Sequence, residues 1–237
     1  MDILTPNHLD AYHGDEFMKR ERGMSSEPRE LRFIAVAGNI GAGKSTLVEF
    51  LERRFQIKPF YEPNDSNPYL KDFYSDMRRW AFQSQVYFLA SKFKIHQDIV
   101  QSAQTVVQDR TIYEDAEIFV ENLYRSRILP KRDYLTYRSM YENIVAMLPP
   151  PDLLIYLRCS VKAVRKRIRL RGRPEEQEIK LNYLKRLHGL YEDWFERYDR
   201  SPALVVDTEQ LDYVHDMVHR IDLIERIEKI MRGEADR

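Results

Sequence analysis

Short apolar runs alternate along this chain with longer stretches in which apolar residues recur every three or four positions. The short runs are rich in Val, Ile and Leu and nearly continuous in hydrophobicity, which is typical of strands buried on both faces of a parallel sheet. They lie at residues 32–38, 57–61, 105–109, 152–157 and 203–207. The longer stretches follow the period of a helix, and they cover residues 44–54, 80–101, 114–124, 133–147, 161–170, 177–199 and 211–231.

The alternation of the two kinds of segment predicts the fold class. Strands separated by helices imply right-handed crossovers and an α/β fold, with a doubly wound parallel sheet flanked by helices. Ligands of such folds bind at the carboxyl ends of the strands, so candidate chemistry is expected at that edge. No internal repeat and no linker rich in Gly and Ser follows residue 31. Residues 31–237 are therefore expected to form a single domain.

Residues 1–30 have a different character from the rest of the chain. They are polar, lack a sustained period of either kind, and carry seven acids against four Lys and Arg residues. We expect them to form a flexible N-terminal tail, which is too acidic for a basic transit peptide. Met24 is a candidate alternative start within this tail.

Composition then excludes several classes of function. The 237 residues carry 38 Lys and Arg against 38 Asp and Glu, so the chain lacks the basic footprint of a protein that tracks a nucleic acid polymer or an anionic membrane. Its single cysteine, Cys159, has no partner for a disulfide within the chain. No apolar run reaches the roughly 18 residues needed to cross a bilayer. These observations predict a cytoplasmic protein that binds neither a nucleic acid polymer nor a membrane.

A glycine-rich loop follows the first predicted strand directly. Residues 38–46 satisfy the pattern G-x-x-x-x-G-K-[ST] between a strand and a helix. The glycines let backbone N–H groups converge on phosphate oxygens, and the helix adds its positive end. Lys44 is expected to reach the β- and γ-phosphates of ATP, and Ser45 to offer its hydroxyl to Mg²⁺. The loop residues predicted to bind ATP are Gly38, Asn39, Gly41, Ala42, Gly43, Lys44, Ser45 and Thr46.

Charged residues end the next two predicted strands. The second strand leads into Glu62, whose carboxylate could take a proton from an attacking hydroxyl as a general base. The third ends in Asp109 and Arg110. An acid at that place can hold Mg²⁺ through water, and a guanidinium can pair with a carboxylate or a phosphate.

The densest charge feature lies between Arg158 and Arg173, where eight basic residues occur without an acid. A solvated helix face would be expected to carry acids among these bases at i,i+4 spacing. The run continues through Gly172 and Pro174 into a loop, which suits a lid that folds over a polyphosphate. A nucleic-acid patch is the alternative, although the run is short and has no interleaved aromatic residues.

Aromatic and polar residues share one predicted helix. Trp80, Phe82, Gln85 and Lys92 lie along it. Rings that enclose a planar ligand, together with an amide that both donates and accepts, suit the edge of a nucleobase.

On these motifs the sequence resembles the deoxyribonucleoside kinase family over residues 32–231, and the bacterial deoxyadenosine/deoxyguanosine kinases in particular. The resemblance rests on the phosphate loop, on the stretch from Asn67 to Leu89, and on the string RIRLRGRPEE at residues 167–176. It implies a P-loop kinase fold with a five-stranded parallel sheet flanked by helices and an Arg-rich lid at about residues 168–177. It also implies a homodimer.

The resemblance implies a role in phosphoryl transfer for several matched residues. Glu62 would take the proton from the 5′-hydroxyl of a deoxynucleoside, and Arg110 would hold both that carboxylate and the phosphate. Together with Lys44 these would be the catalytic residues. Asp109 would be associated with Mg²⁺ through water, although several relatives carry Glu there and the shorter Asp leaves this role open. The lid residues matched to phosphate contacts are Arg167, Arg171 and Arg173.

The resemblance also implies a set of contacts to the nucleoside. Tyr74 and Glu176 match the pair that bonds the sugar 3′-hydroxyl, and Gln85 matches the amide that reads the base edge. Trp80 and Phe82 would line the pocket, and Phe119 would stack on the base. Glu62, Lys92, Arg110 and Asp115 complete the predicted substrate site.

Lys92 and Asp115 bear on the choice of base. They match positions where purine and deoxycytidine kinases carry Arg and Asp, and an ion pair buried there would fill the space that a 5-methyl group needs. Thymidine is therefore expected to be a poor substrate. Lys in place of Arg cannot form a bidentate fork, so the choice between adenine and guanine stays open.

The sequence therefore predicts transfer of the γ-phosphate of ATP, with Mg²⁺, to the 5′-hydroxyl of deoxyadenosine or deoxyguanosine in nucleotide salvage, with deoxycytidine a further candidate. One alternative is a nucleoside monophosphate kinase of the thymidylate type, but residues 62–64 lack the Gly-rich, Arg-preceded pattern that holds a monophosphate. Another is a non-catalytic accessory subunit of the same fold. Such a subunit would be expected to lose phosphate-loop or lid residues, and those are present here.

Overall fold

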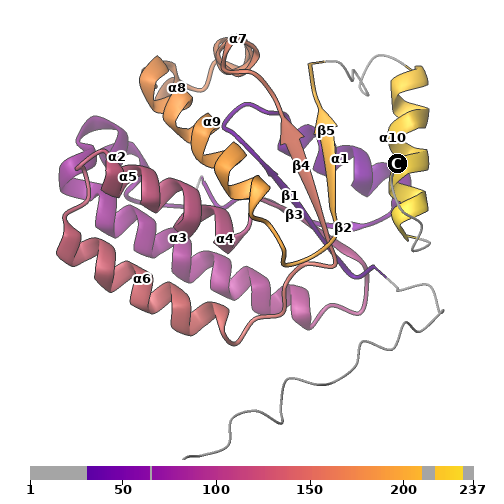
Figure 1. Ribbon diagram of the computed structural model, residues 1–237, viewed down its shortest axis with the longest axis horizontal. Helices are drawn as coiled ribbons and strands as arrows, with labels where there is room; N and C mark the ends of the chain where they lie inside the picture. Colours follow the sequence, from indigo (N-terminus) through magenta and orange to yellow (C-terminus); the bar gives the residue numbers. More distant parts are fainter. Residues whose placement is uncertain (1–30, 65, 210–216, 232–237) are drawn as a thin grey trace, which may run out of the picture.

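Five parallel strands form a single sheet at the centre of the molecule, which is known from a computed structural model that describes residues 31–64, 66–209 and 217–231. The strand order is β2-β3-β1-β4-β5 (Figure 1). All neighbouring strands pair in parallel. The strands are β1 (Phe33–Gly38), β2 (Lys58–Phe60), β3 (Val106–Asp109), β4 (Leu153–Arg158) and β5 (Ala203–Asp207). The predicted α/β class and five-stranded parallel sheet are thus confirmed.

Helices cover both faces of this sheet, with α1 and α10 on one side and α3, α4, α6 and α9 on the other (Figure 1). The helices are α1 (Lys44–Phe55), α2 (Leu70–Ser75), α3 (Met77–Val100), α4 (Ile112–Glu114), the π-helix η1 (Asp115–Val120), α5 (Glu121–Arg125), α6 (Lys131–Val145), α7 (Val161–Arg171), α8 (Pro174–Gln177), α9 (Leu181–Glu196) and α10 (Met217–Met231). Within the described ranges, no helix combines the length and the apolar character needed to span a membrane.

The inner strands β1 and β4 are buried because their side chains are apolar on both faces, whereas the edge strands β2 and β5 are only partly buried. Every residue of β1 is buried, and so are the first five residues of β4. The buried apolar side chains form one cluster that extends from Leu31 to Ile227. This continuity explains why nearly unbroken apolar runs located all five strands from the sequence.

Three local features differ from the elements that the sequence predicts. The six-residue α2 was not expected, because it is too short to show a helical period. The predicted lid loop contains the short helix α8, which begins at Pro174, and α9 therefore starts at Leu181 rather than at residue 177. The N-terminal tail and residues 211–216 of the last predicted helix lie outside the described residues.

The stretch predicted as one helix over residues 114–124 contains a π-helix. It runs through α4, η1 and α5, and η1 carries Asp115 and Phe119. A π-helical turn holds one more residue than an α-helical turn, and such turns occur often at functional sites. The extra residue changes which side chains of this segment face inward, which an α-helical period cannot predict.

Close packing at the end of β1 explains two of the glycines in the phosphate loop. A Cβ atom on Gly38 would lie 2.9 Å from the backbone oxygen of Leu157 on β4, closer than real Cβ atoms approach. Gly43 has φ 105°, in the left-handed region that glycine adopts without strain. The loop can therefore turn sharply from β1 into α1 at the carboxyl edge of the sheet.

Candidate active site

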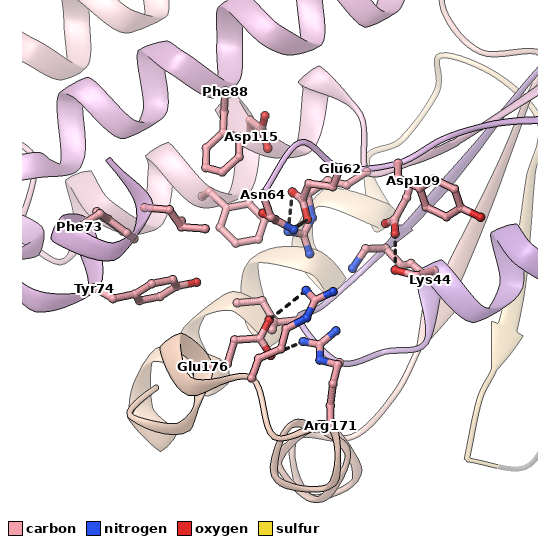
Figure 2. Close-up of a pocket in the computed structure, with 18 of the residues that line it drawn as sticks. Lys44, Glu62, Asn64, Phe73, Tyr74, Phe88, Asp109, Asp115, Arg171 and Glu176 are labelled. Carbon is pink, nitrogen blue, oxygen red and sulfur yellow. Dashed lines mark hydrogen bonds and ion pairs between the residues drawn. The ribbon is translucent and has the colours of Figure 1, made fainter. Parts of the chain in front are cut away.

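A cavity of about 320 Å³ lies at the carboxyl ends of β1, β2 and β3. The segment from α7 to α8 lines one side of the cavity, and side chains of α2 and α3 line the other (Figure 2). The structure brings many of the residues predicted from the sequence into this one cavity. Those lining it are Gly41, Lys44, Ser45, Glu62, Tyr74, Gln85, Asp109, Arg110, Asp115, Phe119, Arg171, Arg173 and Glu176.

Lys44 lies inside the turn of the phosphate loop. Its ammonium donates to the backbone oxygens of Gly38 at 3.0 Å and of Asn39 at 3.2 Å. Burial and the nearby Arg110 guanidinium lower the pKa of Lys44 to about 8, against the opposing effect of the neighbouring carboxylates. A polyanion in the cavity would favour the charged form of this amine and offset its desolvation.

The remaining predicted residues of the loop shape it rather than line the cavity. Asn39 is buried, accepts from the backbone N–H of Ile40 at 2.8 Å and donates to the backbone oxygen of Leu184 at 3.3 Å. Ala42 is buried and Thr46 is exposed at the start of α1. These contacts tie the loop to α9 and fix its backbone.

A hydroxyl and a carboxylate meet where β3 approaches the start of α1. Ser45 donates its hydroxyl to Asp109 Oδ2 at 2.6 Å. The other carboxylate oxygen, Asp109 Oδ1, is buried and has no hydrogen-bond partner among the described residues. Hard oxygen ligands of this kind fit Mg²⁺, which usually keeps several waters and binds phosphate oxygens as well. No group of three or more His, Cys, Asp or Glu side chains in the described ranges could hold a metal unaided.

Glu62 is held by several donors at the centre of the cavity. Arg110 donates through one guanidinium nitrogen to both carboxylate oxygens, at 2.9 and 3.0 Å, and Asn64 donates to Oε2 at 3.0 Å. Lys92 lies 3.4 Å from Oε1. Burial acts to raise the pKa of Glu62, but Arg110, Lys92 and Lys44 outweigh it and hold that pKa well below its usual range. The carboxylate is therefore ionised, which is the protonation state that a general base needs.

Arg110 reaches Glu62 from a strained backbone position. Its φ is 60°, in the left-handed region that few residues other than glycine adopt, at a cost of about 1–3 kcal/mol. Its guanidinium carbon lies 4.5 Å from the centre of the Phe119 ring. The ring and the cation therefore form one wall of the cavity, and base stacking by Phe119 stays a prediction.

The opposite end of the cavity has unsatisfied acceptors. Gln85 Oε1 and Asp115 Oδ2 are buried and have no hydrogen-bond partner in the part of the chain that the structure describes. Asp115 Oδ1 accepts from Lys92 at 2.7 Å. Burial raises the pKa of Asp115 to about 6, although Lys92 opposes the shift. Lys92 does not line the cavity itself and lies behind the two carboxylates that it joins.

Two lid arginines pair with the acid predicted to bind the sugar. Arg171 forms an ion pair with Glu176 (Figure 2). Arg173 lies 3.7 Å from the same carboxylate. Gly172, with φ 70°, ends α7 and lets the chain turn between the two arginines. Tyr74 lines the cavity from α2, and burial raises the pKa of its hydroxyl, which therefore stays a proton donor.

Three further predicted contacts are not present in this cavity. Trp80 stacks on Tyr69 with 5.9 Å between ring centres, and Phe82 packs against the hydrophobic core. Arg167 donates to the backbone oxygen of Ala42 at 3.0 Å and to Thr208. These side chains are held by partners outside the cavity, so they support the loop and the core instead of lining the cavity.

Sequence reasoning missed several lining residues. Asn64 follows Glu62 and Pro63, so its place at the sheet edge was available from the strand pattern. Phe88 was not missed: the family resemblance implies that it narrows the pocket, and it lines the cavity one helical turn after Gln85, a spacing that places both on one face of α3. Leu70, Phe73 and Tyr183 also line it, but short α2 and the packing of α9 left no local signal for them.

Glu114 is a further buried acid that the motifs did not single out. It accepts from the backbone N–H of Thr111 at 2.9 Å, from the Tyr191 hydroxyl at 2.9 Å and from the backbone N–H of Gly38 at 3.3 Å. Burial raises its pKa against the effect of the nearby cations. It therefore joins the phosphate loop, the turn after β3 and helix α9.

Comparison with known proteins adds a second line of argument. The model of the deoxynucleoside kinase family matches residues 34–232. A deoxyadenosine/deoxycytidine kinase of Bacillus subtilis is 38% identical over 84% of this chain and 92% of its own length. A deoxyguanosine kinase of Lactobacillus acidophilus is 37% identical over 82% of this chain and 88% of its own. The structure of deoxyadenosine kinase from M. mycoides with dCMP and dCDP bound has a TM-score of 0.74 and 34% identity, and covers 84% of this chain and 99% of that one.

Proposed function

The chain belongs to the deoxynucleoside kinase family, and we propose that its cavity transfers the γ-phosphoryl group of ATP to the 5′-hydroxyl of a deoxynucleoside in nucleotide salvage. The observation that carries the assignment of the site is the position of Glu62. Its ionised carboxylate lies in one cavity with Lys44 of the phosphate loop and with the buried polar groups Gln85 and Asp115. No observation favours the monophosphate kinase or the accessory subunit.

Glu62 and Arg110 are proposed to act on the two sides of the bond that forms. Glu62 accepts the proton of the 5′-hydroxyl as its oxygen attacks the γ-phosphorus and ADP departs. Arg110, which contacts Glu62, would stabilise the transferring charge. Lys44 neutralises the β- and γ-phosphates, and Arg171 and Arg173 approach them from the lid.

Mg²⁺ is proposed to bind beside Ser45 and Asp109, where the buried Asp109 Oδ1 lacks a partner among the described side chains. The ion would reach Asp109 through water and would supply charge neutralisation for the β- and γ-phosphates when bound. The Ser45 hydroxyl and the Asp109 carboxylate are the residues that would hold it. Asp109→Ala should therefore raise the Mg²⁺ concentration needed for half-maximal turnover.

The unpaired acceptors at the far end of the cavity point to the base. Gln85 Oε1 and Asp115 Oδ2 each lack a hydrogen-bond donor among the described residues. The exocyclic amino group of adenine, cytosine or guanine can supply one. Thymine presents a carbonyl oxygen instead of an amino group, and an acceptor facing two acceptors is unfavourable. Deoxyadenosine and deoxyguanosine are the proposed substrates, with deoxycytidine also accepted and thymidine disfavoured.

A homodimer and a cytoplasmic location are further parts of this proposal. Leu135 on α6 is 54% exposed, and Met147, just after that helix, is 68% exposed. Large apolar side chains on one outer layer suit burial against a second copy. Light scattering after size exclusion would give the mass in solution, and a monomer at micromolar concentration would reject the dimer.

A panel of acceptors tests the proposed reaction. ADP release should be measured with Mg-ATP and each of the four deoxynucleosides, and with dTMP as the acceptor that a monophosphate kinase would use. We expect turnover with the amino-bearing nucleosides and little with thymidine or dTMP. Absence of turnover with deoxyadenosine, deoxyguanosine and deoxycytidine would reject the proposed function, whereas turnover that favours thymidine would reject only the assignment of the base.

A further inference from the structure

A second concave surface lies on the outer side of the lid helix, away from the cavity just described. The groove has a volume of about 620 Å³ and runs between α7 and the start of α9. Its lining combines basic and apolar side chains and contains no acid. The lining residues are Val161, Lys162, Arg165, Lys166, Arg169, Leu170, Leu181 and Lys185.

The basic side chains of this groove have no ionic partner among the described residues. Lys162, Arg165, Lys166 and Arg169 are spaced i, i+3, i+4 and i+7 along α7, so they share one face of the helix. In the part of the chain that the structure describes, these four and Lys185 take part in no salt bridge. Like charges at this spacing destabilise a helix, so the face is electrostatically costly without an anion.

The same helix places its other arginines differently. Arg167 is held by Ala42 and Thr208, and Arg171 pairs with Glu176. The basic run singled out in the sequence is therefore divided by helix geometry into a paired set toward the cavity and an unpaired set toward the groove. The catalytic proposal uses only the first set.

The apolar residues of the groove restrict the kind of ligand. Leu170 is 77% exposed, and Val161 and Leu181 are half-buried beside the cations. Carboxylates between apolar side chains would match this surface, as in an acidic peptide. Single-stranded nucleic acid usually stacks its bases on aromatic side chains, and none lines this groove.

One segment of the chain itself has the matching composition. Residues 1–18 contain four acids and no Lys or Arg, and the first basic residue is Lys19. The acids alternate with apolar residues. The acids are Asp2, Asp10, Asp15 and Glu16, and the apolar residues include Ile3, Leu4, Leu9, Tyr12, Phe17 and Met18.

The length of the intervening chain permits the contact. Residues 19–30 can span about 40 Å when extended. Residue 31 leads into β1 at the amino edge of the sheet, whereas α7 follows β4 at the carboxyl edge. The two strands are neighbours, and six residues of strand cover about 20 Å. The connection is therefore longer than the height of the sheet that it must pass.

We propose that residues 1–18 dock in the groove between α7 and α9 of the same chain, with their carboxylates on Lys162, Lys166, Arg169 and Lys185 and their apolar residues on Leu170 and Leu181. The docked segment would cover the outer face of the helix whose inner face carries the lid arginines. This inference concerns binding and does not depend on the proposed substrate.

Zero-length crosslinking of the full chain tests the contact directly. A carbodiimide joins a carboxylate to a lysine only when the two touch, and mass spectrometry locates the bond. We expect crosslinks from Asp10, Asp15 or Glu16 to the groove lysines to exceed those to Lys131, an exposed lysine on α6, by about tenfold. They should fall severalfold when salt rises from about 50 mM to about 500 mM, because salt screens exposed charges.

Matched charge reversals separate the groove from a general effect of net charge. Lys166→Glu/Arg169→Glu should abolish the crosslinks to Lys162 and Lys185. The control Arg53→Glu/Arg54→Glu changes two exposed cations at the end of α1 by the same amount and should leave the crosslinks unchanged. Crosslinks spread evenly over exposed lysines, or equal loss in both variants, would overturn the proposal.

A second measurement keeps the proposal testable if the groove variant fails to fold. Acetylation rates of Lys162, Lys166 and Lys185 should rise at least threefold when the four acids of residues 1–18 are replaced by their amides, while the rate at Lys131 stays constant. Unchanged rates would reject docking.

If the groove binds something other than residues 1–18 of the same chain, the experiments give different results. Crosslinks that join isotopically labelled to unlabelled copies would assign the contact to a second copy. Binding of an oligothymidylate at about 150 mM salt that depends on Lys166 and Arg169, without tail crosslinks, would assign the groove to nucleic acid. Either result would overturn docking within one chain.

Discussion

Glu62 and Asp115 both lie near the Lys92 ammonium, at 3.4 and 2.7 Å, and yet the pKa values of their carboxyl groups shift in opposite directions. Their side chains are only 11% and 5% exposed, so desolvation acts on both in the same sense. Glu62 also receives two contacts from Arg110 and one from Asn64. Asp115 has Lys92 on one oxygen and no hydrogen-bond partner among the described residues on the other.

The difference distinguishes two ends of one cavity. At the completed end the protein supplies donors to both oxygens of Glu62, and at the open end one oxygen of Asp115 has no donor among the described residues. The carboxylate nearest the phosphate loop is satisfied by the protein and stays charged whether or not a ligand is bound. The carboxylate at the far end has one oxygen without a donor among the described residues, and a bound ligand could supply that donor. Burial makes the charged form of both carboxyl groups less favourable, and the number of donors from the protein decides whether hydrogen bonds and ion pairs offset this desolvation.

The largest expected effect comes from removing the charge at the completed end. Glu62→Gln keeps the shape of the side chain but cannot accept a proton, so turnover should fall by about 10²–10⁴. Binding of the nucleoside, measured by calorimetry, should change little. Glu196→Gln, at the exposed end of α9, serves as the control and should keep its rate. Turnover within twofold of the parent would remove Glu62 from the role of base.

Removing the shared cation tests whether Lys92 supports both ends. Lys92→Met leaves Asp115 buried without a cation, and breaking a buried pair in this way costs about 3–5 kcal/mol. The midpoint of thermal unfolding should fall by roughly 6–20 °C, as measured by circular dichroism.

The double variant Lys92→Met/Asp115→Asn is the matched control for that prediction. Because no buried charge is left at the far end, much of the lost stability should return. A double variant that is less stable than Lys92→Met would show that Lys92 mainly serves Glu62.

The open end is tested through the choice of base. Asp115→Asn replaces an acceptor-only group with one that can also donate. The ratio of kcat/KM for deoxyadenosine to that for thymidine should fall by about 10- to 100-fold, which corresponds to about 1–3 kcal/mol for an unpaired buried group. A ratio that does not change would exclude Asp115 from reading the base.

The smallest effect is the dependence of stability on pH, and its sign differs between the two residues. The pKa of Asp115 is raised from 3.8 to about 6, so its contribution is present below 3.8 and is lost as the pH rises through 6. The lowered pKa of Glu62 gives a contribution that is present above 4.5 and is lost as the pH falls.

Urea unfolding of the parent and the two amide variants from pH 4 to pH 7 measures both signs. The stability of the parent relative to Asp115→Asn should decline across this range, by of the order of 1 kcal/mol. Relative to Glu62→Gln it should not decline. Parallel curves for the two variants would mean that the two carboxylates share one environment.

The parts of the molecule that the sequence predicts well are those that local pattern determines. Buried parallel strands need continuous apolar residues, and the phosphate loop needs its glycines at fixed places, so the sheet edge and the residues that end its strands could be located. Glu62, Asp109 and Arg110 were found for this reason, and the structure brings them together.

The parts that the sequence did not predict depend on which neighbours each helical side chain meets and on the local phase of the helix. Arg167 and Arg171 are one turn apart on α7, yet the first supports the loop and the second lines the cavity. Trp80 and Gln85 likewise lie on one helix, but Trp80 stacks on Tyr69 whereas Gln85 lines the cavity. The π-helical turn at Asp115 changes the phase of its segment, and a period of 3.6 residues contains no sign of it.

The ion pair between Arg171 and Glu176 has a thermodynamic consequence for the order in which substrates bind. Glu176 is the acid expected to bond the sugar, and Arg171 is a cation expected to bond phosphate, so each substrate competes with the same internal contact. A nucleoside that engages Glu176 would release Arg171 for ATP, and ATP that engages Arg171 would release Glu176. By linkage, each substrate should then raise the affinity for the other by the same factor.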